Sequence, residues 1–195
     1  MKNLKLEMHF AAAAALCAAG AANAAIVAWE NCNLLIPANI DGMYINVETQ
    51  MTGTAGSAVA GWDINPYGSN ALTWWNAAGT GMMRYPGVVT GSAGSLANGA
   101  SVSATASYGS GSVTFGSAAG NWQYNAVNNF GFKFVAADGS TKFGYGTMSV
   151  GANATIRTIT NLYYESSGAA IAVGAVPAPG ALALLGLAGL ASRRR

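Results

Sequence analysis

The chain combines 195 residues, 52% of them hydrophobic, with few charges: only 8% are charged, and the formal net charge is +2. The excess of positive charge lies at the two ends, because residues 25–176 hold six acidic and four basic side chains. Four scattered cations form no basic stripe that could follow a phosphate backbone, which argues against nucleic acid as a partner. The central part is long enough for one domain with a sizeable core.

The first 24 residues predict a secretory signal peptide. Two lysines form its basic start, residues 10–22 form its Ala-rich apolar core, and Ala22-Asn23-Ala24 is an A-x-A cleavage site. We therefore expect export through the Sec translocon and cleavage by signal peptidase between Ala24 and Ala25. A structural helix is the alternative, but the small residues of the cleavage site argue against it.

Cleavage at this site would leave few groups for catalysis. It removes His9, the one histidine, and Cys17, so that Cys32 is the only cysteine of the mature chain. Without histidine there is no Ser-His-Asp or Cys-His pair and no His-ligated zinc. A lone Cys32 is expected to be a buried small residue, with an intermolecular disulfide as the alternative. We predict no enzymatic activity and no cofactor; the weaker alternative is a glycoside hydrolase that uses two carboxylates, although their spacing indicates no pair.

The central residues show strand patterns and no 3.6-residue apolar stripe. The clearest signal is a hairpin that turns at Asp138-Gly139, where glycine allows the positive φ of a tight turn. The expected strands are residues 43–47, 132–134, 142–150 and 155–164, with weaker ones at 102–107 and 112–115. Short strands between Gly, Asn and Ser turns predict an antiparallel β-sandwich, jelly-roll-like or lectin-like, over residues 25–165.

Tryptophans are the first candidates for ligand binding in this domain. Trp74-Trp75-Asn76 and Trp122-Gln123-Tyr124-Asn125 combine flat aromatic faces with amides, the composition of saccharide sites. Neighbours in a strand point to opposite faces, so one of Trp74 and Trp75 is expected in the core. Core packing is the competing interpretation for every tryptophan, including Trp122.

Oxygen-bearing side chains are the second candidates. Asp63 with Asn65, and Asp138 with Ser140, could offer ligands to Ca²⁺. Neither pair has the spacing of an EF-hand, and both are typical of turns. We therefore predict no metal site.

The C-terminal part divides into a stem and a tail. Residues 166–175 are rich in small side chains and predict a flexible stem. The tail, residues 176–195, consists of Val176, Pro177, Pro179 and Gly180, then an apolar run from Ala181 to Ala191, then Arg193, Arg194 and Arg195. An apolar segment that ends in clustered arginines is a stop-transfer arrangement, and the prolines keep its helix from extending upstream.

This tail resembles the PEP-CTERM sorting signal of Gram-negative bacteria, although Ala178 stands where that family usually has Glu. The resemblance implies transient anchoring in the inner membrane, processing by an exosortase, and delivery to the cell surface or an exopolysaccharide matrix. An ordinary single-span anchor is the alternative. The uninterrupted run of 11 residues would cover about 17 Å as a helix, against a hydrocarbon core of about 30 Å.

The domain itself resembles a recurring group of exported PEP-CTERM proteins. The matching segments are residues 40–47, 61–67, 130–134, 143–146 and 163–166. This resemblance implies no activity. We therefore predict an exported, non-enzymatic protein of the cell surface or extracellular matrix, associated with exopolysaccharide. The alternative is a lectin-like module that binds carbohydrate through Trp74, Trp75 or Trp122.

Overall fold

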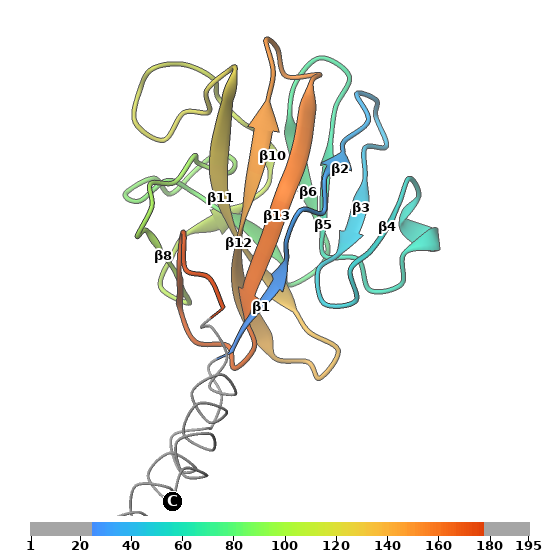
Figure 1. Cartoon of the computed structure of the whole chain (residues 1–195), viewed down its shortest axis with the longest axis vertical. Coiled ribbons are helices and arrows are strands. Elements are labelled where there is room, and N and C mark those ends of the chain that lie inside the picture. Colours follow the sequence, from blue (N-terminus) through green and yellow to red (C-terminus); the bar gives the residue numbers. More distant parts are fainter. Residues whose placement is uncertain (1–24, 178–195) are drawn as a thin grey trace, which may run out of the picture.

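The computed structural model describes residues 25–177, which form an all-β protein (Figure 1). These residues contain no α-helix and one 3-10 turn, η1 (Gly56–Ala58). Among them we find no helix that is long and apolar enough to span a bilayer. The predicted signal peptide (residues 1–24) and most of the predicted sorting tail with its apolar helix (residues 178–195) lie outside the described residues.

The strands form two large sheets and a small third one, and all paired strands are antiparallel. The seven-stranded sheet runs β1 (Ile26–Trp29), β13 (Arg157–Glu165), β12 (Thr141–Val150), β11 (Ala126–Val135), β7 (Gly81–Met83), β9 (Tyr108–Gly109), with β2 (Leu34–Leu35) also on β13. The five-stranded sheet runs β10 (Gly111–Ser112), β6 (Thr73–Asn76), β5 (Ile64–Tyr67), β3 (Tyr44–Asn46), β4 (Met51–Gly53). The small sheet pairs β14 (Ile171–Ala172) with β8 (Ser101–Val102).

The predicted all-β class with antiparallel strands is confirmed, and the arrangement is consistent with a β-sandwich. The expected hairpin is present: β11 and β12 pair from Ala126↔Val150 to Val135↔Thr141 and turn at Gly139, whose φ is +80°. The expected strands at 43–47 and 155–164 are β3 and β13. Those expected at 102–107 and 112–115 shrink to β8 and β10, two residues each, and β5, β6 and β7 were not predicted.

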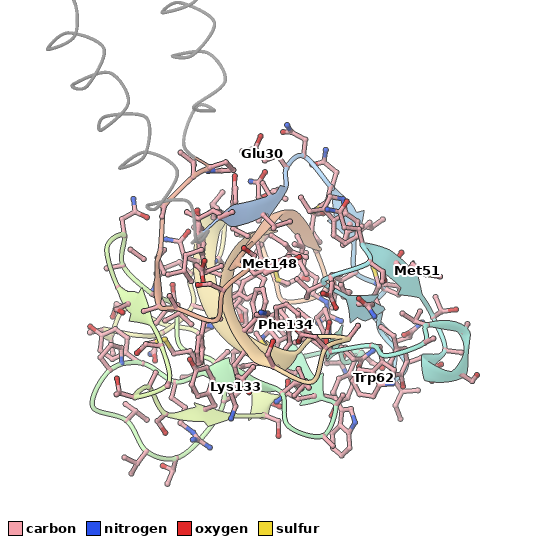
Figure 2. All side chains as sticks on the ribbon, turned by 90° about the horizontal axis from the view of Figure 1, so that it is seen from below. Glu30, Met51, Trp62, Lys133, Phe134 and Met148 are labelled. Atoms are coloured by element: carbon pink, nitrogen blue, oxygen red, sulfur yellow. The ribbon has the colours of Figure 1, made fainter. Side chains whose placement is uncertain are left out.

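An aromatic column on β11 joins the two large sheets. Phe130, Phe132 and Phe134 alternate along this strand, all with 0% exposure, and point to the same side. Phe130 packs on Trp74 of β6, with ring centroids 4.9 Å apart, so the column reaches the opposite sheet. Figure 2 shows Phe134 inside the ring of strands, together with Met148 of β12. These residues belong to one core cluster that draws on both sheets.

Glycines on β12 make room for these rings. Gly146 stands opposite Phe130, and Gly144 stands opposite Phe132. A Cβ on Gly146 would lie 2.4 Å from Cζ of Phe130, and one on Gly144 would lie 2.5 Å from Cζ of Phe132. No real Cβ makes contacts this short, so the two glycines are required by packing across the hairpin rather than by a turn.

The other face of the seven-stranded sheet is also covered. A second core cluster gathers side chains of the sheet, such as Tyr145 and Tyr163, under residues of the segments 96–106 and 171–175. Ile171 and Val173 are each 2% exposed. The middle of β12, residues 142–146, is therefore buried on both faces of the sheet.

The prediction of a flexible stem at residues 166–175 is wrong. Oε2 of Glu165 accepts hydrogen bonds from the backbone N–H groups of Ser167 and Ala169 at 3.0 and 2.7 Å, and from the Ser167 hydroxyl. Burial raises the pKa of Glu165, but these donors outweigh it and hold the pKa below its ordinary value. Composition suggested flexibility because small residues are common in linkers, whereas here they fit closely against the sheet.

Both ends of the described chain lie at one pole, at the bottom of Figure 1. The carbonyl of Ala25 accepts a hydrogen bond from the N–H of Ser166 at 3.0 Å. The hydroxyl of Tyr145 donates to the carbonyl of Ala175 at 2.7 Å, and its ring stacks on Tyr163 of β13 at 4.8 Å. The two ends are thus fixed to neighbouring parts of the same sheet.

A buried arginine organises the opposite pole. Arg157, at the start of β13, is 1% exposed and donates to four backbone carbonyls, at distances of 2.7–3.2 Å. Its acceptors are the carbonyls of Pro37, Gly68, Ala71 and Ala154. Burial lowers the pKa of Arg157 below its ordinary value. Because the acceptors come from three separate loops, this one side chain ties together the loops that close the pole.

The fit of glycine against phenylalanine gives a first prediction. Gly146→Ala should lower the free energy of unfolding by about 1–3 kcal/mol, because the methyl group would overpack the core against Phe130. In a Phe130→Leu background the same change should cost about 1 kcal/mol less, since the smaller side chain relieves the clash. Urea unfolding measures both values, and Ser149→Ala on the same strand is the control.

If Gly146→Ala acted only by reducing the conformational freedom of the unfolded chain, the substitution would stabilise the protein. A more stable Gly146→Ala variant would therefore contradict the packing explanation.

Candidate functional site

Strand β6 sends its two tryptophans to opposite sides of the five-stranded sheet. Trp74 is 0% exposed and belongs to the core, whereas Trp75 is 56% exposed on the outer face. The prediction that one of the pair lies in the core is confirmed. An indole that presents more than half of its surface to solvent on a regular strand is held rigidly and is available to a ligand.

The side chains beside Trp75 on this outer face are uncharged. Register places Asn65 opposite Trp75, and it aligns Tyr67, Thr73 and Ser112 in the next row. The hydroxyls of Thr73 and Ser112 are 2.9 Å apart and hydrogen-bonded. The amide nitrogen of Asn65 donates to the carbonyl of Asp41 at 2.8 Å, which fixes the orientation of its amide. Asn65 is itself only 2% exposed, so it cannot contact a ligand. We call Tyr67, Thr73, Trp75 and Ser112 the outer-face cluster.

Aromatic side chains continue across β3 on the same face. The ring of Tyr44 meets the indole of Trp62 edge to face, with centroids 4.9 Å apart. Figure 2 shows Trp62 at the periphery of the molecule, away from the core that contains Phe134. Flat rings next to hydroxyls, with no charge between them, match the apolar C–H faces and the hydroxyls of a neutral sugar.

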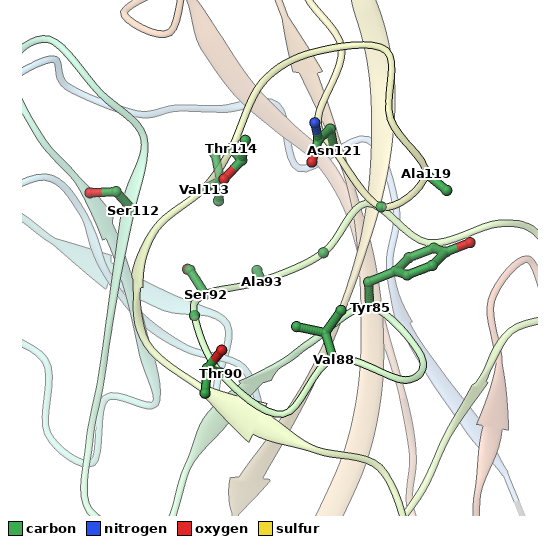
Figure 3. A pocket seen from close by; sticks show the side chains of 13 residues that line it. Tyr85, Val88, Thr90, Ser92, Ala93, Ser112, Val113, Thr114, Ala119 and Asn121 are labelled. Carbon is green, nitrogen blue, oxygen red and sulfur yellow. The ribbon is translucent and has the colours of Figure 1, made fainter.

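A hydroxyl-lined hollow adjoins the edge of this sheet (Figure 3). It has a volume of about 140 Å³, and its lining includes Ser112 of the outer-face cluster. Figure 3 shows the side chains of Thr90, Ser92, Thr114 and Asn121 around it. No charged residue lines this hollow. Its chemistry therefore continues that of the outer-face cluster.

The structure corrects two of the three predicted saccharide contacts. Trp74 and Trp122 are both 0% exposed, so neither can stack on a sugar. Nε1 of Trp122 donates to the carbonyl of Ala93 at 3.0 Å, inside the core. Both indoles fill the interior, where the chain has few large aliphatic residues, although Nε1 of Trp74 finds no acceptor among the described residues. Only Trp75 remains of the predicted set.

Most partners of Trp75 were missed by sequence reasoning. Tyr67, Thr73 and Ser112 come from three strands, and only their register brings them to one face. Alternation in residues 64–67 and 73–76 was the available signal. It was weak because a proline and two adjacent tryptophans interrupt the polar–apolar pattern.

A second hollow lies at the pole where the chain ends, and it is acidic. It has a volume of about 340 Å³, and Glu48 and Asp63 line it. Asp63 is only 3% exposed, and its Oδ2 accepts a hydrogen bond from the N–H of Val47 at 2.8 Å. Burial raises the pKa of Asp63 to about 7, and the negative charge of Glu48 adds to this rise.

The sequence suggested that Asp63 and Asn65 are turn residues, but Asp63 immediately precedes β5 and Asn65 lies within it. The other pair does form a turn, because Oδ1 of Asp138 accepts from the N–H of Ser140 at 2.8 Å. No group of three or more His, Cys, Asp or Glu residues that could hold a metal occurs within residues 25–177. Cys32 is half-buried with a free thiol, and burial raises its pKa.

Comparisons with known proteins give no relative: no family model matches the chain, and no curated protein or solved structure is similar to it. The geometry of the molecule must therefore carry the functional argument.

Asp63 gives a prediction of pH dependence in the absence of divalent cations. Its folded-state pKa of about 7 lies above its ordinary value of 3.8, so between these pH values the folded state binds more protons than the unfolded state. Stability should therefore fall as pH rises from about 4 to 7, at up to ~1.4 kcal/mol per pH unit. Asp63→Asn should keep the acceptor for Val47 and remove this slope.

The measurement is urea unfolding from pH 4 to pH 8 in EDTA. Glu165 works in the opposite direction, because its lowered pKa makes stability fall in acid, so the difference between wild type and Asp63→Asn isolates the Asp63 contribution. Parallel pH profiles for the two proteins would show that Asp63 is not a buried titrating group.

Proposed function

We propose that this chain is an exported protein of the cell surface or extracellular matrix, held transiently in the inner membrane by its C-terminal tail. The observation that supports this is the position of the two ends of the described chain. Ala25 and Ala175 are fixed at the same pole, and Val176 just beyond is 58% exposed. A signal peptide before this point and a sorting tail after it would both leave from one end of the domain.

That arrangement suits a protein that is tethered and then released. The tether would occupy one pole, while the outer face of the five-stranded sheet and the Arg157 pole would stay free. The partners of this route are the Sec translocon, signal peptidase and an exosortase-type enzyme, which the two terminal segments imply. We also propose that the two large sheets form a jelly-roll-like or lectin-like sandwich, since they share one aromatic core.

Intact-mass analysis of the released protein tests this proposal. We expect the mature chain to begin at Ala25 and to end between Pro177 and Gly180, because processing at the Pro-x-Pro segment would remove the apolar run and the arginines. Released protein that still ends in Arg195 would contradict the sorting tail and favour a plain anchor.

A second candidate function, binding of a neutral polysaccharide, is favoured by the exposure of Trp75. The indole stands on a regular strand, with the hydroxyl-bearing side chains of Tyr67 and Thr73 in the next row. Aromatic anchors of this kind supply large contact area at low cost in conformational entropy. This function needs no catalysis, and we propose a non-enzymatic role. A glycoside hydrolase would have to use Glu48 and Asp63, which share a hollow at the opposite end of β5 from Tyr67.

Affinity electrophoresis in gels that contain the polysaccharide of the producing cell tests this second candidate. Trp75→Ala should weaken binding by about tenfold or more, which corresponds to the loss of ~1.4 kcal/mol from one aromatic anchor. Tyr124→Ala is the matched control, because Tyr124 is 46% exposed but stacks on Phe115 outside the outer-face cluster.

Equal retardation of wild type and Trp75→Ala, or none for wild type, would overturn saccharide binding at this face. Release of reducing sugar that depends on Glu48 would instead support the hydrolase. Both tryptophan and tyrosine variants should remain folded, since neither side chain is buried.

A further inference from the structure

The acidic hollow contains a carboxylate oxygen to which no residue of the described chain donates. The main chain of Asp63 is fully engaged: its N–H donates to Ile45, and its carbonyl accepts from Ala77 and from the Thr80 hydroxyl. Its Oδ2 accepts from Val47. No residue between 25 and 177 donates to Oδ1, although the side chain is almost fully buried and the residue lines the hollow.

Glu48 brings a second carboxylate to the same hollow. Its Oε2 accepts from the N–H of Ala137 at 2.8 Å, and within the described chain no group donates to Oε1. Ala137 follows β11 in the turn of the central hairpin, while Glu48 follows β3 of the opposite sheet. The hollow thus lies where the two large sheets meet at the tethered pole.

The remaining polar groups around the hollow are also mainly oxygens. Ala60 and Gly61 line it, and the carbonyl of each accepts one hydrogen bond from the amide of Asn46, which leaves a second lone pair on each oxygen. No lysine, arginine or histidine lines this hollow. Two carboxyl groups therefore face one space without any positive side chain, and loss of the Asp63 proton would leave two negative charges there.

We propose that this hollow is a calcium site, with Oδ1 of Asp63 and Oε1 of Glu48 as its protein carboxylate ligands. Carboxylate, carbonyl and water oxygens are the ligands that Ca²⁺ takes, six to eight at a time. A space of about 340 Å³ leaves room for several waters and for the flexible coordination of Ca²⁺. Mg²⁺ is less suited, because it demands a near-ideal octahedron at short distances.

The site would have a structural role that is independent of saccharide binding. Glu48 already contacts the turn of the β11–β12 hairpin, and Asp63 immediately precedes β5. A cation between them would fasten the hairpin to the five-stranded sheet at the pole where the chain leaves the domain. With a dissociation constant of about 10⁻⁴–10⁻³ M, roughly that of extracellular calcium modules, the site would bind calcium only after export.

Calorimetric titration and thermal unfolding of the released protein test the proposal. Starting from protein stripped with EDTA, we expect CaCl₂ to bind with one site per chain and to raise the unfolding temperature by about 3–6 °C at tenfold excess over its dissociation constant. The same concentration of MgCl₂ should shift it less.

Glu48→Gln should abolish both effects while leaving the fold in EDTA intact, because Glu48 is exposed and a glutamine oxygen can still accept from Ala137. Asp63→Asn should act in the same way. Asp138→Asn is the control, since it removes one equally exposed charge from a turn outside the hollow. An absent calcium effect in wild type, or an undiminished effect in Glu48→Gln, would overturn the site.

Discussion

The packing of phenylalanine over glycine across the central hairpin is the constraint on which the rest of this structure depends. Phe130 and Phe132 can point into the core only because Gly146 and Gly144 stand opposite them with no side chain. The rings then reach Trp74 of the other sheet, which closes the interior. The position of Trp74 in turn determines the outward position of Trp75, because neighbours on a strand face opposite ways. The candidate binding face is thus a consequence of how the core is filled.

Polar side chains close the two poles of the domain by hydrogen-bonding backbone groups, which apolar core residues cannot do. Arg157 donates to carbonyls of three loops at one pole, and Glu165 accepts from backbone N–H groups at the other. Both charges are buried against main-chain partners rather than against a side chain of opposite charge. Removal of either one would leave several backbone groups without partners in a buried place, which costs more than the loss of a surface ion pair.

Sequence reasoning found the parts of this fold that depend on local pattern. Asp138-Gly139 and the alternating phenylalanines were enough to predict the central hairpin, because turn chemistry and a two-residue period are local signals. The short strand β14 was not found and β8 was predicted too long, since two residues carry no period and the pairing of these strands joins positions about 70 residues apart. For the same reason the small residues of 166–175 suggested a flexible stem, although they fit against Tyr145 and Glu165.

The candidate sites likewise combine features that local sequence pattern predicts with features that only distant contacts determine. One outward tryptophan in Trp74-Trp75 was predictable from strand geometry, but which of the two it would be depended on the packing of Phe130. The buried position of Trp122 depended on contacts with distant residues such as Ala93. The pairing of Glu48 with Asp63 around one hollow came from the fold alone, because no spacing in the sequence relates the two carboxylates.

Function in this account rests on a domain that is tethered at one pole and offers an uncharged aromatic face at its side. The most direct test follows the indole N–H signals of the released protein by NMR during titration with the polysaccharide of the producing cell. We predict that the signal of Trp75 shifts with increasing polysaccharide, while those of the buried Trp74 and Trp122 stay in place. A titration that leaves the signal of Trp75 unmoved would contradict the account.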